Sequence, residues 1–142
     1  MTTIKDDFRV AAVQTVSFAS LEPNLEQAAG LIAEAAADGA GLVALPEYFC
    51  LMGRRDGDKV KLRESPGQGP IQDFLGEQAR RHAVWLVGGT LPIESPDSGR
   101  IYNTSLVYAP DGSQAARYDK IHLFGFKKGD ESYDESVSIR PG

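Results

Sequence analysis

The first 45 residues constrain the fold most, because apolar side chains recur there in three successive patterns. Residues 8–18 hold a nearly continuous run of small apolar side chains, which predicts a buried strand. Between residues 25 and 38 the apolar side chains follow helical spacing, and Gly39 and Gly41 predict the end of that helix. Residues 42–45 predict a second short buried strand. A strand, a helix and a strand in this order predict a βαβ crossover with parallel, neighbouring strands.

The rest of the chain predicts one more helix and three more strands. The helix begins at Pro70, and the strands cover residues 83–91, 100–109 and 113–118, the last two joined by a hairpin turn. We expect loops at residues 48–69, 92–99 and 121–142. The first of these loops is long, and long loops in compact domains usually serve a function. Together the elements predict one α/β domain whose mixed sheet is covered by helices on one face.

Composition narrows the classes of partner and cofactor. The net charge of -5 argues against a nucleic acid or a membrane surface as partner, and we expect short pairs such as Arg54-Arg55 to be solvated surface. Two histidines and one cysteine make no metal-binding pattern, and no dinucleotide or phosphate motif occurs, so we expect no metal and no cofactor. The single cysteine and the polar residues 1–7 predict a cytoplasmic location.

Two short motifs point to a chemistry. Residues 42–49 are Leu-Val-Ala-Leu-Pro-Glu-Tyr-Phe, and residues 117–124 are Arg-Tyr-Asp-Lys-Ile-His-Leu-Phe. Together they resemble the glutamate and lysine segments of the nitrilase-type carbon–nitrogen hydrolases, and the stretch Lys-Ile-His-Leu-Phe is the more specific. The resemblance runs from Val10 to Gly142. It implies an α-β-β-α sandwich, truncated here, with residues 1–142 as the N-terminal portion of a single carbon–nitrogen hydrolase domain.

Three charged residues are the candidate catalytic groups. Glu47 follows a buried strand, where desolvation raises the pKa of a carboxyl group, although a glutamate after a strand is more often solvated. A fixed ammonium at Lys120 could stabilise a negative oxygen, although most lysines at strand ends lie in water. The resemblance implies that Glu47 is a general base and that Lys120 is the electrostatic stabiliser. It also implies that Glu135 orients the lysine, unless Glu135 belongs to a solvated acidic loop.

The residues next to Glu47 leave alternatives open. Tyr48 and Phe49 line the substrate pocket or pack in the core. Cys50 is close enough in sequence to exchange a proton with Glu47. However, the cysteine nucleophile of the family follows the lysine segment, so we expect Cys50 to be a packed thiol.

The resemblance therefore implies a hydrolase that cleaves the amide of a small carboxylic acid by glutamate, lysine and cysteine, in the branch of the ω-amidases and deaminated-glutathione amidases. The cysteine nucleophile is missing from this chain. The expected partner is a small-molecule amide, and we expect a homo-oligomer when the protein is full length. The alternative is a catalytically inert fragment or pseudo-enzyme that complements a second polypeptide or only binds a ligand.

Overall fold

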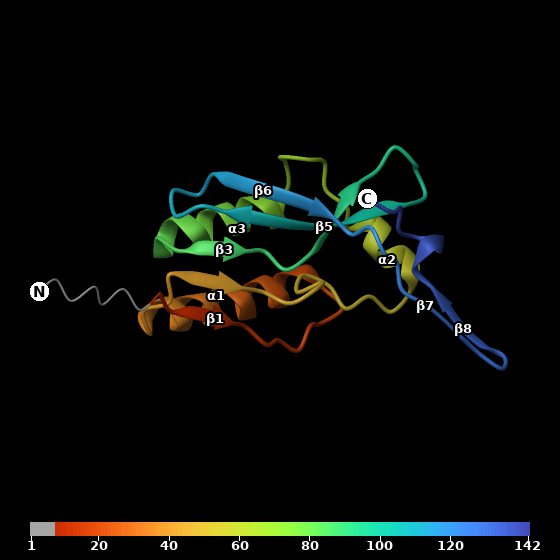
Figure 1. Ribbon diagram of the computed structural model, residues 1–142, viewed down its shortest axis with the longest axis horizontal. Helices are drawn as coiled ribbons and strands as arrows, with labels where there is room; N and C mark the ends of the chain where they lie inside the picture. The colour runs from red at the N-terminus through yellow and green to blue at the C-terminus, as the bar shows by residue number, and fades with distance from the viewer. Residues whose placement is uncertain (1–7) are drawn as a thin grey trace, which may run out of the picture.

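The computed structural model describes residues 8–142 (Figure 1). The polar N-terminal segment 1–7, on which the expected absence of a secretory signal depends, lies outside the described residues. Within residues 8–142 no helix combines the length and the apolar character needed to cross a membrane. The elements, in chain order, are β1 (Val10–Ala12), α1 (Leu21–Ala37), β2 (Leu42–Ala44), α2 (Asp56–Lys61), α3 (Pro70–His82), β3 (Trp85–Val87), β4 (Leu91–Glu94), β5 (Ile101–Tyr108), β6 (Gln114–Asp119), β7 (Gly125–Lys128), β8 (Glu131–Asp134) and a 3-10 turn, η1 (Glu135–Val137).

The predicted βαβ crossover is present at the start of the chain. Strands β1 and β2 pair in parallel, with Val10 opposite Leu42, and helix α1 connects them. Gly39 ends the helix with a φ of 86°, in the left-handed region that glycine adopts without a steric cost. The amide of Gly41 then donates to the carbonyl of Arg9, which brings the chain back beside β1.

Six strands form one mixed sheet, and β5 pairs with three of the others. The order is β1-β2-β3-β5-β4, and β6 pairs with the other edge of β5. Strands β1, β2 and β3 are parallel, β5 runs against β3, and β6 runs against β5. Strand β6 therefore points the same way as β2 and β3, so the carboxyl ends of all three strands meet at one end of the sheet.

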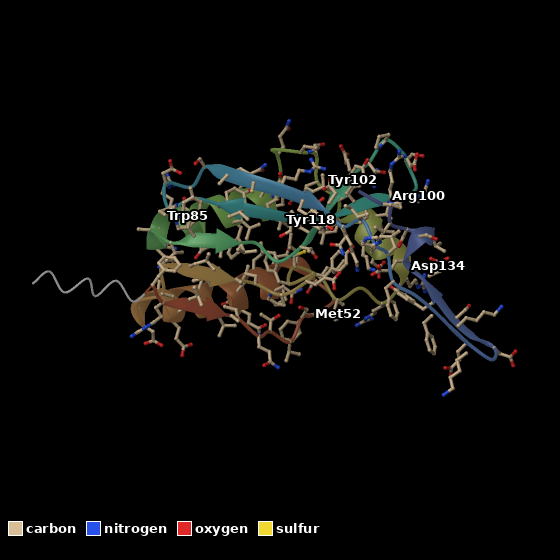
Figure 2. The ribbon with its side chains drawn as sticks, viewed as in Figure 1. Met52, Trp85, Arg100, Tyr102, Tyr118 and Asp134 are labelled. Carbon is tan, nitrogen blue, oxygen red and sulfur yellow. The ribbon has the colours of Figure 1, made fainter. Side chains whose placement is uncertain are left out.

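The hydrophobic core lies between the sheet and helices α1 and α3. Ile32 of α1 and Leu75 of α3 are 0% exposed, and they belong to the same buried cluster as Val43 and Leu86 of the sheet. The opposite face of the sheet is apolar but open. It carries large exposed side chains, among them Val10, which is 62% exposed. Trp85 is 40% exposed and Tyr118 is 55% exposed (Figure 2). The observed sheet agrees with the predicted α/β class, in which helices cover one face of a mixed sheet.

Three expected loops contain additional elements. Helix α2 lies within residues 48–69, and β4 begins at Leu91 and extends into residues 92–99, where Pro92 pairs with Asn103 of β5. Residues 121–142 form the β7–β8 hairpin, which projects beyond the sheet in Figure 1, followed by η1. Every residue of this hairpin is exposed, so the alternation of apolar and polar side chains that reveals a strand is absent.

The first strand is shorter than predicted. Strand β1 covers only residues 10–12 of the expected 8–18, and Val16 is 74% exposed. Its partner β2 also has three residues, and Pro46 has no N–H to extend the ladder. The apolar run that predicted a strand over residues 8–18 therefore extends past the three residues that pair with β2.

Candidate active site

Glu47 lies in a tight turn directly after β2. The backbone of Pro46 passes so close to Gly89 that a Cβ atom there would lie 2.0 Å from the Pro46 carbonyl oxygen. Tyr48 has a φ of 48°, which is unusual for a residue with a side chain, and its amide donates to Oγ1 of Thr90 at 3.0 Å. Strained backbone of this kind is frequent at functional sites. The turn presents Glu47 at the carboxyl end of the sheet.

Lys120 reaches the same place from the end of β6. Its amide donates to the carbonyl of Asn103 at 2.9 Å, and its own carbonyl accepts from the amide of Gly142 at 2.9 Å. The Nζ atom lies 3.2 Å from Oε1 of Glu47 and 3.0 Å from Oε2 of Glu135. Residues 73 positions apart in sequence are thereby joined in one ion cluster.

Glu135 begins η1 and is the most buried member of the cluster. Its side chain is 9% exposed, against 27% for Lys120 and 54% for Glu47. The backbone amide of Phe124 donates to Oε2 of Glu135 at 2.8 Å, which fixes the carboxylate. Glu135 is thus part of a buried contact rather than of a solvated acidic loop. Glu47, by contrast, is exposed, so the desolvation expected at this strand end is not observed.

The electrostatic environment keeps Lys120 charged. Desolvation by itself lowers the pKa of an ammonium, but the hydrogen bonds from Nζ to Glu135 and Glu47 outweigh it and raise the pKa of Lys120 above its ordinary value. Lys120 is therefore a fixed positive charge at neutral pH. A fixed positive charge at such a place can stabilise a developing oxyanion.

Asn103 is a site residue that the sequence analysis did not identify. It is 1% exposed on β5, and its Nδ2 donates to Oε1 of Glu47 at 2.7 Å. Glu47 Oε1 therefore receives hydrogen bonds from both Asn103 and Lys120. In the sequence Asn103 is the first of three consecutive polar residues in a predicted strand, and nothing distinguishes it from the other two. Its contact with Glu47 joins residues 56 positions apart, so no local pattern in the sequence reveals it.

The two aromatic residues after Glu47 point to different places. Tyr48 lines a cavity of about 330 Å³ together with Glu47, Glu135 and Tyr133. Burial, and then the nearby charges of Glu135 and Glu47, raise the pKa of Tyr48 well above its ordinary value, so its hydroxyl remains a donor. Phe49 is 1% exposed and stacks on Phe74, with ring centroids 6.4 Å apart. The expectation that Phe49 lines the pocket is corrected, because it packs in the core.

Cys50 is a buried thiol. It is 0% exposed, and its Sγ lies 4.0 Å from the carbonyl oxygen of Thr90. Burial raises the pKa of the Cys50 thiol to about 12, so the thiolate needed for nucleophilic attack is not formed at neutral pH. In the part of the chain that the structure describes, no group of three or more histidine, cysteine, aspartate or glutamate side chains could hold a metal ion.

The fold and the charged cluster together define an α/β protein with a glutamate–lysine–glutamate centre at one end of its sheet. The family model of the carbon–nitrogen hydrolases matches residues 9–142, and the chain belongs to that family.

Two kinds of curated relative illustrate the similarity. The chain is 35% identical to the omega-amidase NIT2 of Mus musculus over 136 residues, which are 95% of this chain and 48% of that protein. It is also 35% identical to the deaminated glutathione amidase of Synechocystis over 138 residues, which are 95% of this chain and 50% of that protein. The chain thus spans about half the length of the curated relatives it matches.

Solved structures agree with this assignment. The NitFhit protein of C. elegans matches with a TM-score of 0.80 and 29% identity, over 94% of this chain and 32% of that one. Nit3 of Saccharomyces cerevisiae, described as a member of branch 10 of the nitrilase superfamily, matches with a TM-score of 0.73 and 30% identity, over 89% of this chain and 45% of that one. The predicted family and fold class are confirmed.

Proposed function

We propose that these residues form the glutamate and lysine part of an active site that hydrolyses the amide of a small carboxylic acid. The observation that supports this proposal most is the position of Lys120 Nζ between the carboxylates of Glu47 and Glu135. The names of the relatives, an omega-amidase and a deaminated glutathione amidase, support an amide as the substrate.

Each residue has a role that its surroundings suit. Glu47 is the general base, because its carboxylate is more than half exposed and can reach a thiol or a water molecule that arrives from solvent. Lys120 stabilises the oxyanion of the tetrahedral intermediate with its fixed charge. Glu135, held by the amide of Phe124, orients Lys120 and can accept a hydrogen bond from the amide nitrogen of the substrate.

The nucleophile is a cysteine other than Cys50. Cys50 is the only cysteine of the 142 residues, and its thiol is buried and protonated. We therefore propose that the nucleophile is supplied from outside these residues, and that this chain by itself does not hydrolyse amides. The same observation also fits the alternative, in which this chain is a fragment that complements a second polypeptide.

The test measures ammonia release from glutaramate and succinamate. We expect none above the buffer rate from the 142-residue chain, whereas turnover that disappears in Cys50→Ser would make Cys50 the nucleophile. In a version that continues into a cysteine-bearing segment, Lys120→Ala should lower kcat by about 10²–10³ without unfolding the protein. Lys128→Ala, an exposed lysine of β7, is the matched control and should keep full activity.

A further inference from the structure

We propose that Asn103 is a positioning residue for the candidate general base. Its side chain holds one carboxylate oxygen of Glu47, Oε1, and so leaves the other, Oε2, as the oxygen that accepts the proton. This inference rests on the proposed function, because it concerns the way in which Glu47 would act as a base. Asn103 does not touch the substrate in this role, since it acts through Glu47.

The two oxygens of the Glu47 carboxylate have different surroundings. Oε1 accepts from Nδ2 of Asn103 at 2.7 Å and from Nζ of Lys120 at 3.2 Å. Within residues 8–142, no donor forms a hydrogen bond with Oε2. The Glu47 side chain is 54% exposed, so a thiol or a water molecule can approach it from solvent. The lone pairs of Oε2 are therefore the ones available for a proton.

Asn103 acts from a strand whose backbone is held on both sides. It lies on β5 opposite Pro92 of β4, and its carbonyl accepts from the amide of Lys120 at 2.9 Å. Its backbone thus contacts Lys120, while its side chain contacts Glu47. Glu47 itself lies in a turn rather than in a strand. A rigid strand therefore fixes the position of the base relative to the cation, as precise chemistry requires.

The orientation of the Asn103 amide depends on the carboxylate. Asn103 is buried, and within residues 8–142 its Oδ1 has no hydrogen-bond partner. Exchanging the two ends of the amide would place Oδ1 against Oε1 of Glu47, and both of these oxygens are acceptors. The amide can therefore face an ionised Glu47 only through Nδ2.

The unpaired Oδ1 indicates that stability does not explain an asparagine at this position. A buried acceptor without a partner costs free energy, and an apolar side chain of similar volume, such as leucine, avoids this cost. Buried groups that lower stability in this way often serve a function. A neutral amide also suits the task, since a second cation beside Lys120 would weaken Glu47 as a base.

NMR at pH 7 on the 142-residue chain tests the positioning. Three-bond couplings report the side-chain rotamers of Glu47, and we expect one rotamer to dominate in the starting chain. In Asn103→Leu the ratio of major to minor rotamer should fall about ten-fold, because a hydrogen bond to a charged group is lost. The urea midpoint of this variant should not fall, because the unpaired Oδ1 is removed as well. Asn103→Ala, with a smaller side chain, provides the same comparison if leucine prevents folding.

The matched control is Thr104→Val. Thr104 is also buried on β5, and its Oγ1 donates to Oδ1 of Asp119 at 2.6 Å. This variant removes a buried side-chain hydrogen bond next to Asn103, and the rotamer ratio of Glu47 should stay within about two-fold of the starting chain. Unchanged Glu47 rotamers in the Asn103 variants, with or without a loss of stability, overturn the proposal.

Kinetics in the version with a cysteine-bearing segment test whether the positioned carboxylate is the base. Asn103→Leu should lower kcat about ten-fold and leave KM within about two-fold. The acid limb of its kcat/KM profile should move up by about 1 pH unit, because the amide hydrogen bond favours an ionised carboxylate. A profile that does not move overturns the proposal. If that version with Asn103 intact hydrolyses no amide, the proposed function is rejected, and the rotamers still decide whether Asn103 positions Glu47.

Discussion

At the residue scale, the three members of the charged cluster differ in how far water screens them. The Glu135 side chain is 9% exposed and Glu47 is 54% exposed, and both contact the same ammonium of Lys120. Exposed ion pairs contribute little to stability, whereas a buried carboxylate left without its cation is strongly unfavourable. The Lys120–Glu135 pair should therefore stabilise the fold, and the Lys120–Glu47 pair should serve mainly the chemistry.

Double-mutant cycles measure this difference. With Lys120→Met, Glu135→Gln and Glu47→Gln, we expect a coupling free energy of about 1–3 kcal/mol between Lys120 and Glu135. Between Lys120 and Glu47 we expect less than about 1 kcal/mol. Urea unfolding at pH 7 provides the free energies. Equal coupling for the two pairs would show that burial does not distinguish them.

Because of Cys50, we expect the free energy of unfolding to decrease as the pH becomes alkaline. Burial raises the pKa of the thiol from 9.0 to about 12 in the folded chain, so the native state holds the proton more firmly than the unfolded state does. The resulting stabilisation is complete below pH 9.0 and is lost as pH rises toward about 12. Within this interval each pH unit removes about 1.4 kcal/mol.

The variant Cys50→Ala tests this dependence. At pH 8 it should be about 1 kcal/mol less stable than the starting chain, because a buried side chain is shortened. By pH 10.5 the order should reverse, because alanine has no thiol to ionise. Unfolding by urea at several pH values gives both curves. A constant difference between the curves, or fast labelling of the native thiol by a disulfide reagent at pH 8, would contradict the buried position of Cys50.

At the element scale, helix α3 depends on a cap from outside the helix. Its N-cap residue, Gly69, has no side chain to accept a hydrogen bond. Glu64 takes this role: Oε1 accepts from the amide of Ile71 at 2.6 Å, and Oε2 accepts from the amide of Gln72 at 3.1 Å. Glu64 is 6% exposed, and its own amide donates to the carbonyl of Pro92, so it also joins α3 to β4.

Removing this cap should destabilise the whole fold. We expect Glu64→Ala to lower the free energy of unfolding by about 2–3 kcal/mol, because buried amides of the first turn lose a charged acceptor. Glu64→Gln retains an acceptor oxygen and should cost about half as much. Glu77→Ala, an exposed carboxylate on the same helix, is the control and should change stability by less than about 0.5 kcal/mol. Equal values for Glu64→Ala and Glu77→Ala in urea unfolding would show that Glu64 is not a cap.

At the scale of the whole molecule, the open face of the sheet differs from an ordinary protein surface because it exposes many apolar side chains. Rows of apolar side chains cross it from strand to strand, following the register of the pairs Val10–Leu42–Trp85 and Ala44–Val87–Val107. Val10, Trp85 and Tyr118 are exposed there. Continuous apolar patches beyond a few hundred Å² mark surfaces that associate.

We expect the 142-residue chain to self-associate in a concentration-dependent way and to bind a hydrophobic dye. Trp85→Lys, which places a charge on this apolar face, should reduce both effects by several-fold. Ile121→Lys, an exposed apolar residue outside the six-stranded sheet, is the control. Light scattering after size exclusion decides the matter. A chain that stays monomeric at all concentrations and binds no dye would show that this face does not mediate association.

The sequence by itself determined the features that arise from local periodicity and from contiguous motifs. The βαβ start, the helix from Pro70 and the long hairpin strands follow from patterns of apolar residues, which report burial along one element. The motifs around Glu47 and Lys120 indicated the family, which the family model confirms. The roles of Glu47, Lys120 and Glu135 remain proposals.

The tertiary structure decided what depends on contacts between distant segments. It brought Glu135 and Asn103 to the cluster, and it turned Tyr48 toward the cavity and Phe49 into the core. It also formed the β7–β8 hairpin, where no residue is buried. Periodicity shows that a face is buried, but the direction of one side chain at a turn depends on its backbone φ and on neighbours far away in sequence.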